Sequence, residues 1–248
     1  MTALLELSDI HHRYAQAPVL RGAGMVVRAG EFVGLIGPNG SGKSTLMRIA
    51  AGMLKPDAGE VRIAGIAMHD NSHRAQRQLG FGIDPATLPA LLTGRQVLEL
   101  IASVRDLARL PATTLALAET LRATAAIDLA IGRCSLGQRQ KIGILAGLIG
   151  DPPLVLLDEP LNGLDPLAAF ELKSHLTART RGGAAIVLAT HALDVAERVI
   201  DRAVLMLDGQ LLREWDAASM QGFREAPPGG LEADMVEQLR AADVTART

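Results

Sequence analysis

The 248-residue chain holds a single cysteine, Cys134, and no long apolar run. One cysteine excludes an internal disulfide framework. The longest apolar segments, such as residues 142–150, fall well short of the roughly 18 residues that a membrane-spanning helix needs. The first residues also lack the basic region and uninterrupted apolar stretch of a secretory signal. We therefore expect a cytosolic start and no crossing of a bilayer by this chain.

Charge of one sign is not in excess either, because 25 basic residues stand against 27 acidic ones and the net charge is −2. This balance argues against an electrostatic grip on nucleic acid. An apolar fraction of 48% beside 21% charged residues argues against disorder. The length suffices for one large or two modest domains. The composition thus predicts a globular chain with no nucleic acid partner.

Short β-rich runs alternate with longer helical patterns, which predicts an α/β fold. Three of these runs are almost wholly apolar, as central strands of a parallel sheet covered on both faces should be. The central candidates are residues 32–37, 154–158 and 185–190, and the runs at 4–10, 60–66 and 202–212 are expected to be edge strands.

Residues 93–126 show a helical pattern only. Thr93 and Gln96 have the spacing of a capping box, and Pro111 interrupts the pattern. We expect a helical subdomain over about residues 93–150, within one domain that covers residues 1–215. Residues 216–248 are expected to form a linker, at 221–230, and a peripheral amphipathic helix, at 231–243.

The segment "GPNGSGKST" matches the phosphate-loop pattern G-x-x-x-x-G-K-[ST] and lies between an apolar strand and a helical run. Glycines let backbone N–H groups turn toward phosphate oxygens without obstruction by a Cβ. A lysine adds positive charge, and a serine hydroxyl is a ligand for Mg²⁺. The predicted nucleotide-binding residues are Gly37, Pro38, Asn39, Gly40, Ser41, Gly42, Lys43, Ser44 and Thr45, and chance is a poor explanation because the chain has only four lysines.

A second chemical signal is the pair of acids in "LVLLDEP", at the end of an apolar strand. Ligands of α/β folds lie at this end of the strands. We expect Asp158 to hold Mg²⁺ through water and Glu159 to act as general base toward the attacking water. A surface acidic turn is the alternative.

The stretch "RCSLGQRQK" allows three structural explanations. Ser135 and Gln138 have the spacing of a capping box at the start of a helix. Arg139 and Lys141 fit the solvated face of that helix, and Cys134 fits a small apolar filler.

In this order the motifs resemble those of one family, the ATP-binding subunits of ABC transporters, over about the first 215 residues. The resemblance identifies "GPNGSGKST" as Walker A, "CSLGQ" as the signature, "LVLLDE" as Walker B, "NGLD" as the D-loop, and Thr190 with His191 as the H-switch. The family also has an aromatic residue upstream of Walker A, where this chain has Tyr14.

The resemblance implies a P-loop NTPase core of ABC type, an antiparallel β portion near the N-terminus, and the ligands ATP and Mg²⁺. It implies a head-to-tail dimer in which the signature of one subunit faces the Walker A of the other. Tyr14 would then stack on adenine, and His191 would contact the γ-phosphate and hold the catalytic Glu159. The residues expected to serve the partner's nucleotide are Ser135, Gly137, Gln138 and Asp165.

The chain departs from the family pattern at two positions. Leu136 replaces the first glycine of the usual S-G-G-Q, which leaves Ser135 and Gly137 in place. Asp84 stands where the family has a glutamine that touches Mg²⁺ and the attacking water. A carboxylate there can still approach the metal, but it can also merely cap the turn before Pro85.

The resemblance implies ATP hydrolysis that drives a separate integral membrane permease, at the cytoplasmic face of the cell membrane. The segments at 92–98 and 135–166 look most like ABC-2-type exporters. Two alternatives are a soluble ABC ATPase that acts in translation, on DNA or in iron-sulfur assembly, and a non-hydrolysing regulatory binder. The last is expected to lack Glu159 or His191, and both are present.

Overall fold

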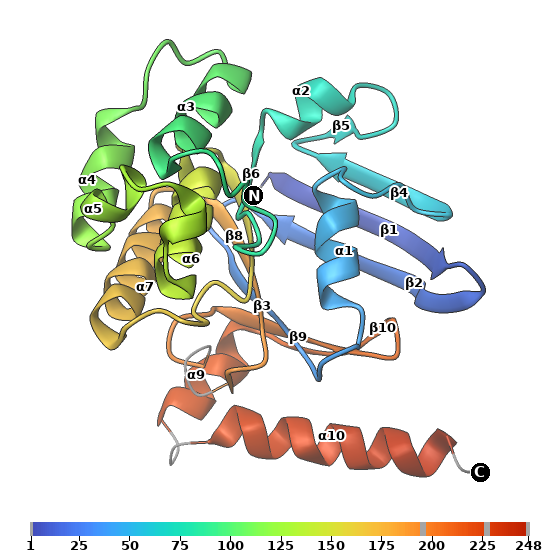
Figure 1. Ribbon diagram of the computed structural model, residues 1–248. Coiled ribbons are helices and arrows are strands. Elements are labelled where there is room, and N and C mark those ends of the chain that lie inside the picture. The colour runs from blue at the N-terminus through green and yellow to red at the C-terminus, as the bar shows by residue number, and fades with distance from the viewer. Residues whose placement is uncertain (1, 194–196, 226–228, 247–248) are drawn as a thin grey trace.

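The computed structural model describes residues 2–193, 197–225 and 229–246. Two sheets face each other with helix α1 (Lys43–Ala50) between them, and most other helices cover the opposite face of the larger sheet (Figure 1). The smaller sheet is antiparallel, with the strand order β2-β1-β4-β5. Its strands are β1 (Ala3–Tyr14), β2 (Ala17–Arg28), β4 (Ala58–Ile63) and β5 (Ile66–Ala67).

The larger sheet has the order β10-β9-β3-β8-β7-β6 and is parallel except for β10. The three apolar runs expected at its centre, β3, β8 and β7, are indeed adjacent, so this prediction is confirmed. The strands are β3 (Phe32–Ile36), β6 (Leu79–Phe81), β7 (Leu154–Asp158), β8 (Ala185–Thr190), β9 (Arg202–Leu207) and β10 (Gln210–Trp215).

Three expectations about edge strands are wrong. β4, in the run at 60–66, lies between β1 and the two-residue strand β5. β9 lies between β10 and β3, and its residues 203–206 are buried. β1 lies between β2 and β4 in the smaller sheet. The reason is that β2 was not among the expected strands, and that residues 202–212 form two strands joined by a tight turn.

The hydrophobic core has two parts, one on each face of the larger sheet. Along β7, Val155 and Leu157 pack toward the helices, and Leu154 and Leu156 pack toward α1 and the smaller sheet. Successive side chains of a strand point to opposite faces, so a strand buried on both faces must be apolar throughout. This explains the uninterrupted apolar runs of β3, β7 and β8.

The expected helical region is present, and the capping box of Thr93 and Gln96 starts α3 with both of its hydrogen bonds. Helices α3, α4, α5 and α6 lie together beside the larger sheet (Figure 1). The remaining bounds are α2 (Ser72–Gln76), α3 (Gly94–Val104), α4 (Ala112–Thr120), α5 (Thr124–Ile127), the 3-10 helix η1 (Ile131–Arg133), α6 (Leu136–Leu148) and α7 (Pro166–Arg181).

The C-terminal segment departs from the expected linker, because α9 (Ala217–Glu225) makes its first half helical. Residues 226–228 lie outside the described residues. The expected final helix is α10 (Gly230–Ala246), which runs below the sheets (Figure 1). It is anchored at its start, where Leu231 is buried and the Trp215 indole donates to Asp234 Oδ2 at 2.7 Å. None of the described helices has the length and apolar character to span a membrane.

Candidate nucleotide-binding site

The phosphate loop connects β3 to α1 and forms one wall of a cavity of about 260 Å³. Its glycines are required by the local backbone. Gly42 has φ 109°, and a Cβ at Gly37 would lie 2.2 Å from the carbonyl oxygen of Met206. The cavity is lined by Val19, Asn39, Gly40, Gly42, Lys43, Ser44, Thr45 and Glu159.

The start of α1 is suited to an anion. No side chain caps the helix at Gly42, so its first N–H groups are free of a capping partner and carry the positive end of the helix dipole. Lys43 is buried and donates from Nζ to the carbonyl oxygens of Gly37 at 2.7 Å and Pro38 at 2.9 Å. Burial lowers the pKa of Lys43, while the nearby Glu159 and Asp158 act in the opposite direction.

Asp158 ends β7 beside a second cavity of about 290 Å³, which lies next to the phosphate loop. Burial raises the pKa of its carboxyl, and the bond from the Ser44 hydroxyl opposes that shift. Asp158 Oδ1 is buried without a hydrogen-bond partner among the described residues. The cavity is lined by Ser44, Arg48, Phe81, Gly82, Asp84, Pro85, Leu136, Gln140, Asp158, Glu159 and Asn162.

This donor set fits Mg²⁺. An orphaned buried carboxylate oxygen is costly unless a cation or water meets it, and the hydroxyl of Ser44 adds a second hard oxygen. No group of three or more His, Cys, Asp or Glu side chains suited to a metal occurs among the described residues. Such a site fits Mg²⁺ held by one or two protein oxygens together with water and phosphate.

The carboxylate of Glu159 is fixed by side chains at the end of β8 and in the turn that follows β7. His191 Nδ1 lies 2.7 Å from Glu159 Oε1, and the Thr190 hydroxyl donates to Oε2 at 3.2 Å. Asn162 Nδ2 is 3.5 Å from the same Oε2. Glu159 itself has φ 47°, a left-handed backbone conformation that is uncommon for a non-glycine residue. The structure therefore brings Glu159 and His191 together beside the phosphate loop.

Asp84 lies in the same cavity as Ser44, Asp158 and Glu159. Its Oδ1 also accepts the N–H of Ala86 at 2.8 Å, which is the turn-capping bond that the sequence left as an alternative. Asp84 can therefore line the cavity and cap the turn at the same time. If Asp84 also binds the metal, its second carboxylate oxygen, Oδ2, is the atom that would face Mg²⁺.

The signature starts α6 with a complete capping box. Ser135 Oγ accepts the N–H of Gln138 at 3.2 Å, and Gln138 Oε1 accepts the N–H of Ser135 at 2.8 Å. Ser135 is exposed and lines neither nucleotide cavity of its own chain. Gly137 approaches the D-loop, since a Cβ there would lie 2.5 Å from Gly163 O. Cys134 is buried in the core, as expected of an apolar filler.

Lys141 is not on a solvated face, which corrects one sequence-based expectation. It is buried, and its Nζ lies 2.8 Å from Asp165 Oδ2. Asp165 also caps α7, through Oδ1 and the N–H of Ala168. These contacts lower the pKa of Asp165 to about 2, with the bond from Lys141 as the largest cause. The helical spacing of Gly137 and Lys141, four residues apart, was the signal that both face the D-loop.

Two glycines of α6 were missed as site residues. A Cβ at Gly143 would lie 2.1 Å from Ile83 O, and one at Gly147 would lie 2.7 Å from Gly82 N. The Ile83 N–H donates to Gly143 O at 3.1 Å. The four-residue spacing lets the helix backbone contact the segment that leads to Asp84, so these glycines place that residue in the cavity.

Tyr14 ends β1, opposite Ala17, and its side chain is 46% exposed. It does not line the phosphate cavity, but the cavity residue Val19 lies near the start of the paired strand β2. The end of this hairpin therefore borders the phosphate site, and an aromatic face stays available there.

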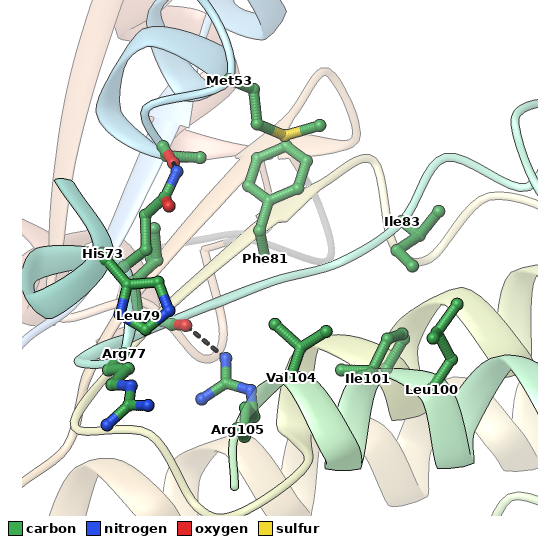
Figure 2. A pocket seen from close by; sticks show the side chains of 13 residues that line it. Met53, His73, Arg77, Leu79, Phe81, Ile83, Leu100, Ile101, Val104 and Arg105 are labelled. Carbon is green, nitrogen blue, oxygen red and sulfur yellow. Dashed lines mark hydrogen bonds between the residues drawn. The ribbon is translucent and has the colours of Figure 1, made fainter.

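A separate groove of about 360 Å³ lies between α3 and the segment from α2 to β6 (Figure 2). Its walls are mostly apolar, and Met53, Leu100 and Val104 are exposed there. Arg77 and Arg105 stand at one end, where Arg105 donates to the carbonyl oxygen of Leu79 (Figure 2). Arg77 pairs with Asp106. This groove contains none of the predicted catalytic residues.

The fold and the site define a P-loop nucleotide-binding protein. A family model described as ABC transporter matches residues 20–162, which is more than half of the chain. The chain therefore belongs to the ABC transporter ATP-binding family and is an ATP-binding subunit of that type, with the α/β fold expected from the sequence.

Relatives and solved structures agree with this assignment. The Nod factor export ATP-binding protein I of Ralstonia nicotianae is 31% identical over 86% of this chain and 67% of its own length. A structure titled as the ATP-binding subunit of an ABC transporter is 31% identical, with a TM-score of 0.82 over 94% of this chain and 98% of its own. A bacterial ABC transporter cassette solved as a dimer is 26% identical, with a TM-score of 0.78 over 86% of this chain and 98% of its own.

Proposed function

We propose that this chain hydrolyses Mg²⁺-ATP in a head-to-tail dimer of ATPase subunits and so drives export by a separate membrane-spanning subunit, at the cytoplasmic face of the membrane. The observation that carries the proposal is the carboxylate of Glu159. It lines both nucleotide cavities and is held by His191 and Thr190. Export is supported by the name of the Nod factor relative, and the dimer by the cassette solved in that state.

Within one chain, each group has a distinct part. The backbone N–H groups at the start of α1 and the Lys43 ammonium bind the phosphates, which requires Lys43 to exchange its two carbonyl partners for phosphate oxygens. Ser44 and Asp158 would hold Mg²⁺, which supplies charge neutralisation at the phosphates. Glu159 accepts a proton from the attacking water. His191 orients that carboxylate through its 2.7 Å contact.

A second copy is needed to complete the site. Ser135 and the N-terminus of α6 are exposed and lie outside both cavities of their own chain. A capped helix N-terminus still attracts an anion. We place Ser135, Gly137, Gln138 and Asp165 against the nucleotide of the partner subunit.

We place the membrane-spanning subunit in the groove between α3 and β6. Its apolar walls, with Met53, Leu100 and Val104 exposed, fit the apolar face of a short cytoplasmic helix. At the end with Arg77 and Arg105, Arg77 is paired with Asp106, and the positive charge of Arg105 favours an acidic residue on that helix. No surface feature described above favours the alternative function, that of a soluble ABC ATPase without a role in transport.

Glu159→Gln tests the catalytic proposal. The amide keeps the shape of the side chain but cannot accept the proton, so turnover should fall by about 10²–10⁴-fold while ATP stays bound. The variant should accumulate as an ATP-dependent dimer in size-exclusion chromatography. As a control, Glu159→Gln with Ser135→Arg should bind ATP and remain monomeric. Near-normal turnover of Glu159→Gln would falsify the assigned role.

A further inference from the structure

His12 is a buried histidine with no evident structural reason for its polarity. It lies on β1 and is 7% exposed, yet neither Nδ1 nor Nε2 has a hydrogen-bond partner among the described residues. The nearest carboxylate oxygen, Asp57 Oδ2, is 4.0 Å from Nδ1. Buried polar atoms are nearly always paired, so an unpaired ring calls for another explanation.

The ring of His12 packs against the ring of Tyr14. The two centroids are 4.9 Å apart and the ring planes cross at 88°. Residues two apart on a strand point to the same face, so β1 itself sets this contact. A perpendicular arrangement brings the positive edge of one ring to the negative face of the other, which is favourable. It is the one such ring pair found in the described part of the chain.

The loop before β4 encloses His12 from the side of Asp57. The Asp57 N–H donates to the carbonyl oxygen of His11 at 2.8 Å, and Asp57 Oδ2 accepts the N–H of Arg13 at 2.8 Å. Both bonds join the loop to the backbone of β1 on either side of His12. The strand is therefore fixed on both sides of His12, whose side chain is buried, while Tyr14 beyond it is 46% exposed.

We propose that His12 is a positioning residue, which fixes the plane of the Tyr14 ring so that its free face can stack on the base of the nucleotide. This inference rests on the proposed function, because it requires that the chain bind ATP at the adjoining phosphate loop. His12 does not touch the nucleotide. It acts by preventing rotation of the exposed tyrosine, whose ordering would otherwise lower the affinity.

The test compares two ligands, ATP and inorganic tripolyphosphate, in equilibrium titrations without Mg²⁺. His12→Leu fills the buried space but removes the ring, so ATP binding should weaken about 2- to 10-fold, the range for an aromatic pair. Tripolyphosphate has no base, and its affinity should not change. His12→Phe restores a ring and should bind ATP within about twofold of the wild type. Combined with Tyr14→Ala, His12→Leu should have no further effect.

With Mg²⁺ present, His12→Leu should raise KM and leave kcat within about twofold. Equal loss of affinity for ATP and tripolyphosphate, or a His12→Phe variant as weak as His12→Leu, would overturn the inference. So would ATP affinity that is unchanged in His12→Leu. Lys43→Ala distinguishes a failure of the His12 inference from a failure of the proposed function. If this variant binds tripolyphosphate normally, the assignment of the phosphate site is wrong. If it abolishes that binding while His12→Leu has no effect, only the role of His12 is wrong.

Discussion

At the scale of single residues, the site contains two ionisable side chains, Asp158 and Lys43, whose charged forms are disfavoured by burial. Burial raises the pKa of Asp158 and lowers that of Lys43, so each favours its neutral form more than an exposed residue does. A bound cation beside Asp158 and bound phosphate beside Lys43 relieve these costs. The electrostatics of the pocket therefore favour ligands of opposite charge at adjacent positions, a cation at Asp158 and an anion at Lys43.

Asp84 adds a third carboxylate to the cavity of Asp158 and Glu159, at a position where the resemblance to the family predicts a neutral amide. Asp84→Asn keeps the oxygen that caps the turn at Ala86 and removes only the charge. If Asp84 belongs to the metal shell, this substitution should shift the Mg²⁺ concentration for half-maximal ATPase activity by roughly threefold or more. Asp84→Gln should preserve or raise the basal rate.

Mg²⁺ titrations of steady-state hydrolysis check this expectation. Asp70→Asn is a suitable control, because Asp70 is an exposed carboxylate that lines neither nucleotide cavity. Superimposable curves for the wild type and both Asp84 variants would leave Asp84 with the turn-capping role alone.

At the scale of elements, α6 links the two halves of the proposed dimer site. It begins at the signature, and the following turns contact the segment between β7 and α7. Gln140 Nε2 is 3.4 Å from the Glu159 carbonyl oxygen, and Lys141 pairs with Asp165. One rigid helix therefore positions both the residues expected to serve the partner's nucleotide and the loop that carries Glu159, the chain's own proposed general base.

Asp165→Asn should destabilise the protein in a pH-dependent manner. Asparagine can still cap α7, so the substitution removes the ion pair with Lys141. The pKa of Asp165 is lowered to about 2 from 3.8, so its stabilising effect is full above about pH 4 and is lost as the pH falls through about 2. Denaturant unfolding of both proteins from pH 7 to 3 should show a constant difference that shrinks only at the acid end.

Lys141→Gln provides the matched control for this prediction. In that background Asp165→Asn should cost less than in the wild type, because the two residues share one interaction. Equal costs in both backgrounds would mean that the ion pair does not contribute to stability.

At the scale of the whole molecule, the larger sheet separates two cores and carries both nucleotide cavities at the carboxyl ends of its central strands. The groove of Figure 2 lies along the boundary between the helical region and the rest of the chain. The segment that leads from β6 to Asp84 joins the two, since Phe81 and Ile83 line the groove and Asp84 lines the cavity that also contains Asp158 and Glu159. A partner bound in the groove would thus contact residues adjacent to the site.

Val104→Asp should separate hydrolysis from membrane attachment. Val104 is 64% exposed, so an aspartate there costs little folding stability, but it places an unpaired charge on the apolar wall. We expect the basal ATPase activity of the purified chain to stay within about twofold. The fraction retained on washed membranes of the producing cells should fall several-fold.

Leu212→Asp is the matched control, since Leu212 is an exposed apolar residue of β10 that lies outside the groove. It should leave retention unchanged. Equal retention of Val104→Asp and the wild type would place the docking surface elsewhere.

The sequence by itself determined the features that depend on neighbouring residues. The phosphate loop, the capping boxes at Thr93 and Ser135, and the buried central strands follow from local spacing and from the physics of helix ends and doubly covered strands. The resemblance to a family supplied the expected pairing of Glu159 with His191, which are 32 residues apart.

Only the tertiary structure decided the contacts between distant segments. Lys141 looked like a surface lysine because nothing nearby in the sequence reveals Asp165, 24 residues away. β9 looked like an edge strand because its neighbours β3 and β10 are set by the topology of the sheet. The environment of His12 was equally invisible, because the sequence does not reveal that its ring is buried and that its nitrogens have no hydrogen-bond partner within the described part of the chain.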